Sequence, residues 1–338
     1  MSANDKRPYH WLSWVSALGL AMVFSLFMWA DLEGHRKVWE ERLAWNTQTQ
    51  KYYMDASGRD LTQQAMLLAQ LVGSNQLVVD KLREAHKVFV ADETTSGAER
   101  LRVLRQELRT LLQDYWSGME GVGVQQFNVF FAPGAVNFLR MQSPDRYGDS
   151  LSGIRPLIAR AFSSGVPAWG IDVARQGSGY RAMLPITANA DATGGVVAVL
   201  EIGMSSLPHG EDVQGEPVQM AIFLRKSAVE QVLWEQTRHA LNQQNPTTVD
   251  DWRLEDTTDP QLHKWWSRGL VPIGQQGQLL HSDDKTYIAS WWELPQPGAQ
   301  EQSGLAMLVW SDITPAYEAY LSTRERVIGK WMTALVCA

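Results

Sequence analysis

Residues 127–141 read FNVFFAPGAVNFLRM, and the hydrophobic period of the chain changes at this point. Phe127, Val129 and Phe131 alternate with Asn128 and Phe130, which is the pattern of a strand. Pro133 and Gly134 then supply a turn. Val136 to Met141 returns as a second strand, so the stretch predicts an antiparallel hairpin that opens a β-rich region.

Downstream of this hairpin the sequence predicts one helix and three more strands. Ser150 to Ser164 carries apolar residues at helical spacing. The strands follow at Pro167 to Val173, Tyr180 to Ile186 and Gly195 to Ile202. Helix and strand are segregated along the chain, which is typical of an α+β fold with helices beside an antiparallel sheet.

Upstream of the hairpin the pattern is helical. Val38 to Val72 is predicted as one long helix, with Gly58 as the position where it would break, and Leu77 to Val90 as a shorter one. A third helix carries an apolar stripe at three- and four-residue steps, made of Leu101, Leu104, Leu108, Leu111 and Tyr115. Ser96 and Glu99 stand at capping-box spacing before it. We expect residues 31–117 to form a helical stalk.

Two apolar segments frame the chain. Trp11 to Ala30 is long enough to span a bilayer and contains no charged residue. Basic Lys6 and Arg7 in the leader, residues 1–10, place that leader in the cytoplasm. A cleaved signal peptide is the alternative reading of the same segment. The second apolar segment starts near Val327, so residues 312–338 are predicted as an exit helix that leads into an incomplete membrane helix.

Composition excludes several classes of function. The 30 basic and 37 acidic side chains give a net charge of -7, which argues against a nucleic-acid partner. The single cysteine, Cys337, allows neither a disulfide framework nor a cysteine metal site in the soluble part. The histidines lack metal-ligand spacing; His281 with Asp283 and Asp284 resembles a metal cluster but is explained more simply by a polar turn. We expect no cofactor and no catalytic centre.

A vaguer second copy of the same element order follows residue 204. Ser205 to Pro217 has the composition of a linker. A strand near Val218 to Leu224, a helix near Ala228 to Leu241 and a hairpin of Thr286 to Leu294 with Gly304 to Trp310 come next. Two modules are therefore predicted, at residues 118–204 and, with the linker, at 205–311.

One block of residues resembles a known family. It comprises FAPG at 131–134, FLRM at 138–141, YGDSLS at 147–152, Arg155, GVP at 165–167 and the stretch 177–185 with Arg181. This block is similar to the double Cache sensor domains of bacterial chemoreceptors, sensor histidine kinases and diguanylate cyclases. The resemblance implies a long N-terminal stalk helix and two tandem PAS-like antiparallel sheets, flanked by transmembrane helices.

The resemblance also implies a function. Such a domain senses a small solute outside the bacterial inner membrane, as a homodimer through the stalk helix. It passes binding through its second membrane helix to a cytoplasmic output domain. Residues 31 to about 326 would then lie in the periplasm. The chain stops before the exit helix could cross, so we expect either a fragment of a longer receptor or a product that has lost its output. The alternative is a membrane-anchored periplasmic protein-interaction module without a small ligand.

In the resembling family the membrane-distal sheet forms the ligand pocket, which implies a set of pocket residues here: Arg140, Tyr147, Asp149, Arg155, Trp169, Asp172 and Arg181. Arg140 is suited to clamping a carboxylate or phosphate, or alternatively to holding the loop at 147–149 by a salt bridge. Arg155 has the same two interpretations. We therefore expect a polar, charged ligand.

Two features leave alternatives open. If residues 175–178 form the hairpin loop, Asp172 lies opposite Arg181, where the two form a structural ion pair or together bind a zwitterion such as an amino acid. Trp169 is either a wall of the pocket or a core residue. The pairs Trp265-Trp266 and Trp291-Trp292 either box an amine or simply pack, with one of Trp291 and Trp292 in the core.

Overall fold

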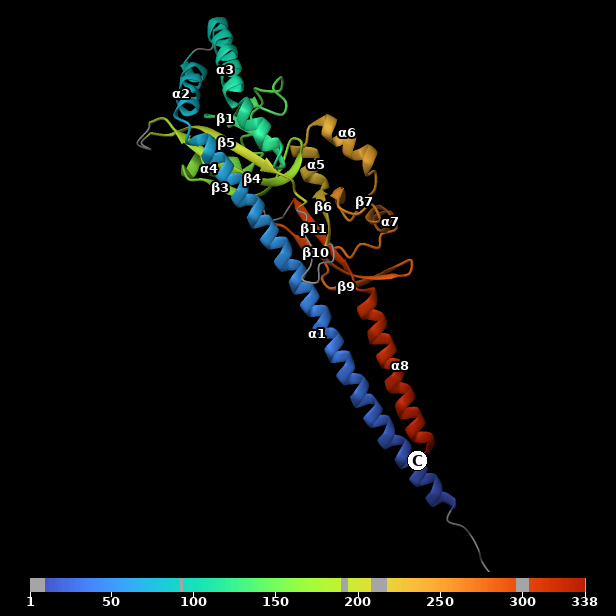
Figure 1. The fold of residues 1–338 in the computed structure, drawn as a ribbon. Coiled ribbons are helices and arrows are strands. Elements are labelled where there is room, and N and C mark those ends of the chain that lie inside the picture. Colours follow the sequence, from blue (N-terminus) through green and yellow to red (C-terminus); the bar gives the residue numbers. More distant parts are fainter. Residues whose placement is uncertain (1–9, 92–93, 190–193, 208–217, 296–303, 338) are drawn as a thin grey trace, which may run out of the picture. The chain divides into compact units, whose positions relative to one another are not determined.

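The computed structural model describes residues 10–91, 94–189, 194–207, 218–295 and 304–337 (Figure 1). These residues form an α+β fold with a long N-terminal helix and two antiparallel sheets, which confirms the predicted fold class. The helices are α1 His10–Gly73, α2 Gln76–Ala91, α3 Thr95–Glu120, α4 Pro156–Ser164, α5 Lys226–Val232, α6 Glu235–Gln244, α7 Leu262–Ser267 and α8 Thr314–Cys337. The strands are β1 Val124–Phe131, β2 Val136–Arg140, β3 Ala168–Ala174, β4 Gly177–Thr187, β5 Val196–Met204, β6 Gln219–Arg225, β7 Thr248–Val249, β8 Trp252–Thr257, β9 Gln278–Ser282, β10 Lys285–Glu293 and β11 Leu305–Asp312.

The chain divides into two compact units. One consists of residues 1–49, 277–289 and 311–338, and the other of residues 50–276 and 290–310. Helix α1 contributes its first part to one unit and its last part to the other.

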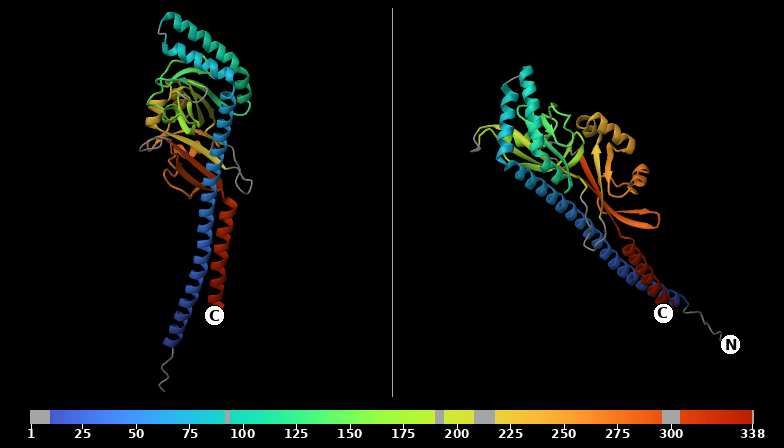
Figure 2. Two further views of the ribbon diagram at one scale, coloured as in Figure 1. Left: turned by 90° about the vertical axis from the view of Figure 1, so that its left-hand side faces the viewer. Right: turned by 45° about the horizontal axis from the view of Figure 1, so that its top comes forward.

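In the first unit, α1 and α8 lie side by side (Figures 1 and 2). Trp39 stacks on Tyr320 with ring centroids 4.9 Å apart, and Phe27 stacks on Trp331 at 5.8 Å. Asp31 accepts a hydrogen bond of 3.0 Å from Nε1 of Trp331. Aromatic packing with a polar tie therefore holds the two helices together.

One helix in the described part of the chain is long and apolar enough to cross a membrane. It is α1, counted from Trp14; its most apolar 18-residue window has a mean hydropathy of 1.8 and none of that window is buried. This finding is compatible with the membrane helix predicted at residues 11–30. Residues 1–9 of the predicted leader lie outside the described part.

Helix α8 begins almost directly after a strand, because only Ile313 separates it from β11. The side chain of Asp312 accepts hydrogen bonds from the backbone N–H of Thr314 at 2.9 Å and from its hydroxyl at 2.6 Å. Pro315 lies in the first turn, where its missing N–H costs nothing. Asp312 therefore caps the start of α8.

In the second unit, the remaining part of α1 continues without a break past Gly58. A Cβ at Gly58 would lie 2.8 Å from the ring of Tyr180 on β4, so only glycine allows this close approach of helix and sheet. Helix α3 is capped by Thr94, whose hydroxyl accepts from the N–H of Gly97 at 3.3 Å. The predicted capping box was wrong, because Glu99 binds Arg102 instead.

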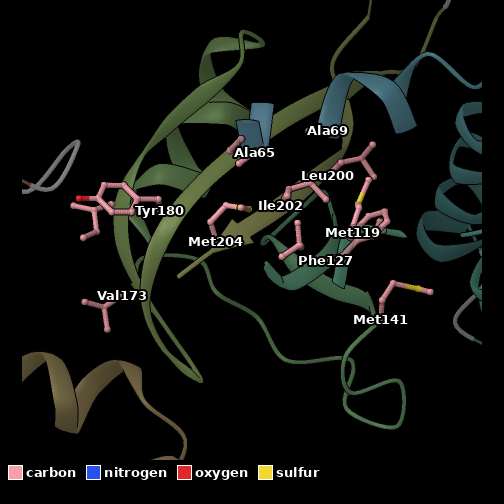
Figure 3. Close-up of a cluster of buried hydrophobic side chains, with 14 of the residues drawn as sticks. Ala65, Ala69, Met119, Phe127, Met141, Val173, Tyr180, Leu200, Ile202 and Met204 are labelled. Carbon is pink, nitrogen blue, oxygen red and sulfur yellow. The ribbon is translucent and has the colours of Figure 1, made fainter. Parts of the chain in front are cut away.

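The first sheet has the strand order β2-β1-β5-β4-β3, with antiparallel neighbours throughout, and we call it, with α4, the first module. The predicted hairpin of β1 and β2 is confirmed. Helix α4 is shorter than predicted, because the segment 150–155 is not helical and Pro156 occupies its first turn. Figure 3 shows Phe127, Leu200 and Ile202 of this sheet on the side where Ala65 and Ala69 of α1 lie.

The second sheet has the strand order β7-β8-β6-β11-β10-β9, and we call it, with α5, α6 and α7, the second module. The helix predicted at 228–241 is in fact two helices, α5 and α6, separated at Leu233 and Trp234. The backbone N–H of Trp234 bonds to Arg175 of the first module and not to the preceding helical turn, which explains the break.

Three of the four paired tryptophans of the second module, Trp265, Trp266 and Trp291, are packed against other rings. Trp265 and Trp266 are both buried, as is Trp291, whereas Trp292 is half-buried. The ring centroids of Phe223 and Trp291 lie 4.8 Å apart. This is the packing alternative of the sequence analysis, with one member of the pair on β10 in the core.

Candidate functional site

Four charged side chains meet inside the first module, and we call them the buried charged cluster. Arg155 precedes α4, Asp172 lies on β3, Arg181 on β4 and Glu201 on β5. Nη2 of Arg155 lies 2.6 Å from Oε1 of Glu201 and 2.9 Å from Oδ2 of Asp172. Nη1 of Arg181 lies 3.1 Å from Oε1 of Glu201. All four residues are at least 96% buried, so their charges compensate one another out of contact with water.

Glu201 is at the centre of the cluster and was not among the predicted residues. It lies inside the apolar strand Val196–Met204. A single carboxylate in a buried strand needs a buried positive partner, so this position could have been predicted from the sequence. Asn128 donates to it at 2.6 Å. Burial alone would raise the pKa of Glu201, but the charges of Arg155 and Arg181 outweigh burial and lower it to about 2. Glu201 is therefore an anion at neutral pH.

The predicted register of β3 and β4 was wrong. The hairpin loop has two residues, Arg175 and Gln176, where four had been assumed. Asp172 therefore lies opposite Gly179, and Arg181 opposite Gly170. A loop two residues shorter moves every partner by two positions. Both side chains still belong to one cluster, because Asp172 pairs with Arg155 and Arg181 pairs with Glu201.

A second group of charges lies next to the cluster. Nη2 of Arg140 lies 2.8 Å from Oδ1 of Asp149, and its Nη1 donates to the carbonyl of Arg146 at 2.7 Å. Nε of Arg175 lies 3.7 Å from Oδ2 of Asp149. Arg140 thus holds the loop, which is one of its two predicted roles. Its role in binding a ligand stays a prediction.

A small polar cavity lies between the two groups. Its volume is about 10 Å³, which is the space of roughly one water molecule. It is lined by Gln126, Asn128, Phe130, Arg140, Gln142, Leu151, Arg155, Ala174, Arg175, Gln176 and Trp234. The site has the donors to hold an anion but has room for no more than about one water molecule.

Two of the seven predicted residues lie elsewhere. Tyr147 is 49% exposed and its ring lies 3.5 Å from the guanidinium carbon of Arg105. Trp169 is 57% exposed, so the core interpretation was wrong. It lines a separate groove of about 510 Å³ with Tyr180 and the segment of α1 around Gly58. The structure thus gathers Arg140, Asp149, Arg155, Asp172 and Arg181.

The fold and the site define a sensory domain of two tandem sheets, and the family comparison agrees. Residues 62–309 match the dCache_3 family, described as "Double sensory domain of two-component sensor kinase". The match covers most of the chain, so the chain belongs to this family of double sensory domains. A comparison with curated proteins gave no match.

Proposed function

We propose that this sensory domain binds a small anionic solute at the charged site of its first module. The single observation that carries the proposal is the charge count around the cavity. Three guanidiniums, those of Arg140, Arg155 and Arg175, line the cavity, and none of its described lining residues carries a carboxylate. A cavity wall made of guanidinium donors favours a ligand with a negative group.

The chemistry of the lining favours a carboxylate. Guanidinium groups bind carboxylates and phosphates through two parallel hydrogen bonds. Asn128 and Gln126 already donate and accept within the site, at 2.6 Å to Glu201 and 2.6 Å from Arg181. Such amides supply the directional hydrogen bonds that discriminate between small polar ligands.

The proposal extends to the whole receptor. The domain lies outside the bacterial inner membrane, anchored by the start of α1, and α8 relays binding to a cytoplasmic output. A homodimer through α1 is supported by three exposed apolar residues at seven-residue spacing, Val38, Trp45 and Tyr52, which are 65%, 47% and 64% exposed. A seven-residue repeat is the pattern of a coiled-coil seam.

Thermal unfolding of the full chain in lipid nanodiscs tests the ligand. The panel contains organic acids, amino acids, inorganic phosphate and amines at about 10 mM; a ligand present at about 100 times its Kd stabilises the folded state by about 2.7 kcal/mol. We expect an anion to raise the unfolding temperature and the amines to leave it unchanged. Arg140→Gln should abolish the shift.

The matched control is Arg225→Gln. Arg225 resembles Arg140, because its guanidinium also lies over a tryptophan, Trp252 at 4.3 Å, and pairs with a carboxylate, Glu293 at 3.2 Å. The shift should survive this change. No shift with any anion, or an equal shift in Arg140→Gln, would overturn the proposed site.

A further inference from the structure

The charged site of the first module is completed by a residue of the second. Trp234 lies between α5 and α6, and its ring centre is 4.8 Å from the guanidinium carbon of Arg140 and 4.5 Å from that of Arg146. Trp234 also lines the cavity. A cationic group over an indole face is held by the ring quadrupole, so the contact favours the closed position of the ring.

The backbone around Trp234 is tied to the same site. Its N–H donates to the carbonyl of Arg175 at 3.0 Å, and Nη1 of Arg175 donates to the carbonyl of Val232 at 3.0 Å. These two bonds join the connection between α5 and α6 to the hairpin loop of β3 and β4. Any movement of one of these segments strains or breaks its bonds to the other.

The second module holds that hairpin at another point. The N–H of Ser178 donates to Oε1 of Glu255 on β8 at 2.8 Å, and the Ser178 hydroxyl donates to the other carboxyl oxygen. A Cβ at Gly177 would lie 2.5 Å from Oε1 of Glu255, so the carboxyl sits directly against the backbone. The second module thus binds the hairpin of β3 and β4 at two points, through the segment 232–234 and through Glu255.

The cavity is too small for a solute unless one of its walls moves. A solute larger than one water cannot enter about 10 Å³ unless a lining group is displaced. Most of the lining belongs to strands β1, β2 and β3 or to the buried ion pairs of Arg155, which is 1% exposed. Trp234 is half-buried and lies between two short helices. Like the loop side chains of Gln142 and Gln176, it can move without breaking a strand or a buried ion pair, and it is the lining residue that the second module supplies.

We propose that Trp234 is the lid of the anion site, supplied by the second module, and that its displacement carries the occupied state of the first module into α5 and α6. This inference rests on the proposed function for the identity of the ligand, but the lid itself can be tested without one. The ligand class it admits is the small anion of the proposed function.

The first test measures how accessible Arg140 is in the full chain. Phenylglyoxal modifies exposed guanidiniums, and peptide mass spectrometry follows each arginine separately. We expect Trp234→Leu to raise the modification rate of Arg140 by about tenfold, because 1.4 kcal/mol of lost closure is a factor of ten. Arg225, under Trp252 in the second module, should not change and reports whether the variant stays folded.

Trp292→Leu is the matched control. Trp292 is also half-buried under a cation, Lys51 at 5.1 Å, but it does not line the site. It should leave Arg140 protected, as should Trp234→Phe, which keeps a ring over the guanidiniums. An increase below roughly twofold in Trp234→Leu, or an equal increase in Trp292→Leu, would overturn the lid, since a tenfold change is the expected cost of losing closure.

A measurement on the unmodified chain keeps the inference falsifiable if Trp234→Leu does not fold. A local lid opens at a lower free energy than global unfolding. Arg140 should therefore react about tenfold faster than Arg155, which opening of the lid leaves in its buried ion pairs. Equal rates for the two arginines would show that the site opens only by unfolding and would overturn the lid.

The experiments can refute the proposed lid and the proposed ligand independently of each other. If Trp234→Leu exposes Arg140 but no anion of the panel stabilises the chain, the lid stands and the proposed function falls. If an anion binds while Trp234→Leu leaves Arg140 protected, the proposed function stands and the lid falls.

Discussion

Glu201 and Glu255 illustrate, at the scale of single residues, how partners set the charge of a carboxyl group. Burial and the neighbouring Asp256 raise the pKa of Glu255, although hydrogen bonds from Ser178 oppose the rise. In Glu201 the charges of Arg155 and Arg181 overcome burial and lower the pKa to about 2. The two groups therefore affect stability in opposite directions as the pH changes.

Glu201→Gln should lower the free energy of unfolding at neutral pH. It should also remove the part of the pH dependence of stability that Glu201 causes. The folded-state pKa is below the ordinary value of 4.5, so the unfolded chain binds the proton more tightly. Stability is thus fully present above about pH 4.5 and falls toward pH 2, by on the order of 3 kcal/mol. Urea unfolding followed by circular dichroism between pH 7 and pH 3 measures the part of this loss that falls above pH 3. Arg155, Arg181, Asp172 and Asn128 face the carboxyl and are unchanged in the variant.

Glu255→Gln is the opposite case and serves as the control. Its raised pKa means that the folded chain holds the proton more tightly, so its contribution is present at acid pH and is lost as the pH rises. The neutral amide should leave stability at pH 7 equal or higher, and the difference should vanish below about pH 4.5. Parallel pH curves for both variants would contradict the assignment of the two charges.

At the scale of elements, the sequence allowed the strands to be located better than their register. The alternation at residues 127–131 and the turn at Pro133 are local signals, and both predicted the observed hairpin. The loop of β3 and β4 has no such signal, since Arg175 and Gln176 are ordinary polar residues. Its length is set by Glu255 and Val232, which bind the hairpin from 57 to 77 residues away.

The contact of α1 with β4 depends on the absence of a side chain at Gly58. Gly58→Ala should destabilise the chain by about 1–3 kcal/mol, because the new methyl group overlaps the ring of Tyr180. Thermal or urea unfolding measures the change. Adding Tyr180→Leu, which removes the ring, should recover part of the loss.

Gly118→Ala is the matched control. Gly118 also lies inside a helix, α3, but nothing lies within 4 Å of its added Cβ. The change should stabilise the chain by up to about 1 kcal/mol, as expected for alanine in a helix. A destabilisation of similar size at both positions would show that the ring contact is not the cause.

At the scale of the molecule, one apolar core joins both sheets. The same cluster contains Leu108 of α3, Phe127 of β1 and Ile222 of β6. A shared core makes its parts unfold together. The family and its tandem architecture could be predicted from one block of residues, whereas the contact of Trp234 with Arg140 could not, because it joins positions 94 residues apart without a local pattern.

Core truncations should therefore lower the stability of both sheets at once. Phe127→Ala in the first sheet and Ile222→Ala in the second should each cost about 3–4 kcal/mol. Hydrogen exchange with mass spectrometry should show faster global exchange of β1 and β8 peptides in either variant. Leu67→Ala removes a side chain that is 59% exposed and should change neither. Loss of protection confined to the mutated sheet would contradict a shared core.

Only one residue, Ile313, connects β11 to α8, so the connection has little freedom to flex. A flexible linker would absorb small movements, but Ile313 is flanked by a hydrogen-bonded strand and by the cap of Asp312 on Thr314. Each residue added at this joint would rotate every side chain of α8 by about 100° about the helix axis. An insertion at Ile313 would therefore change which side chains of α8 face Trp39 of α1.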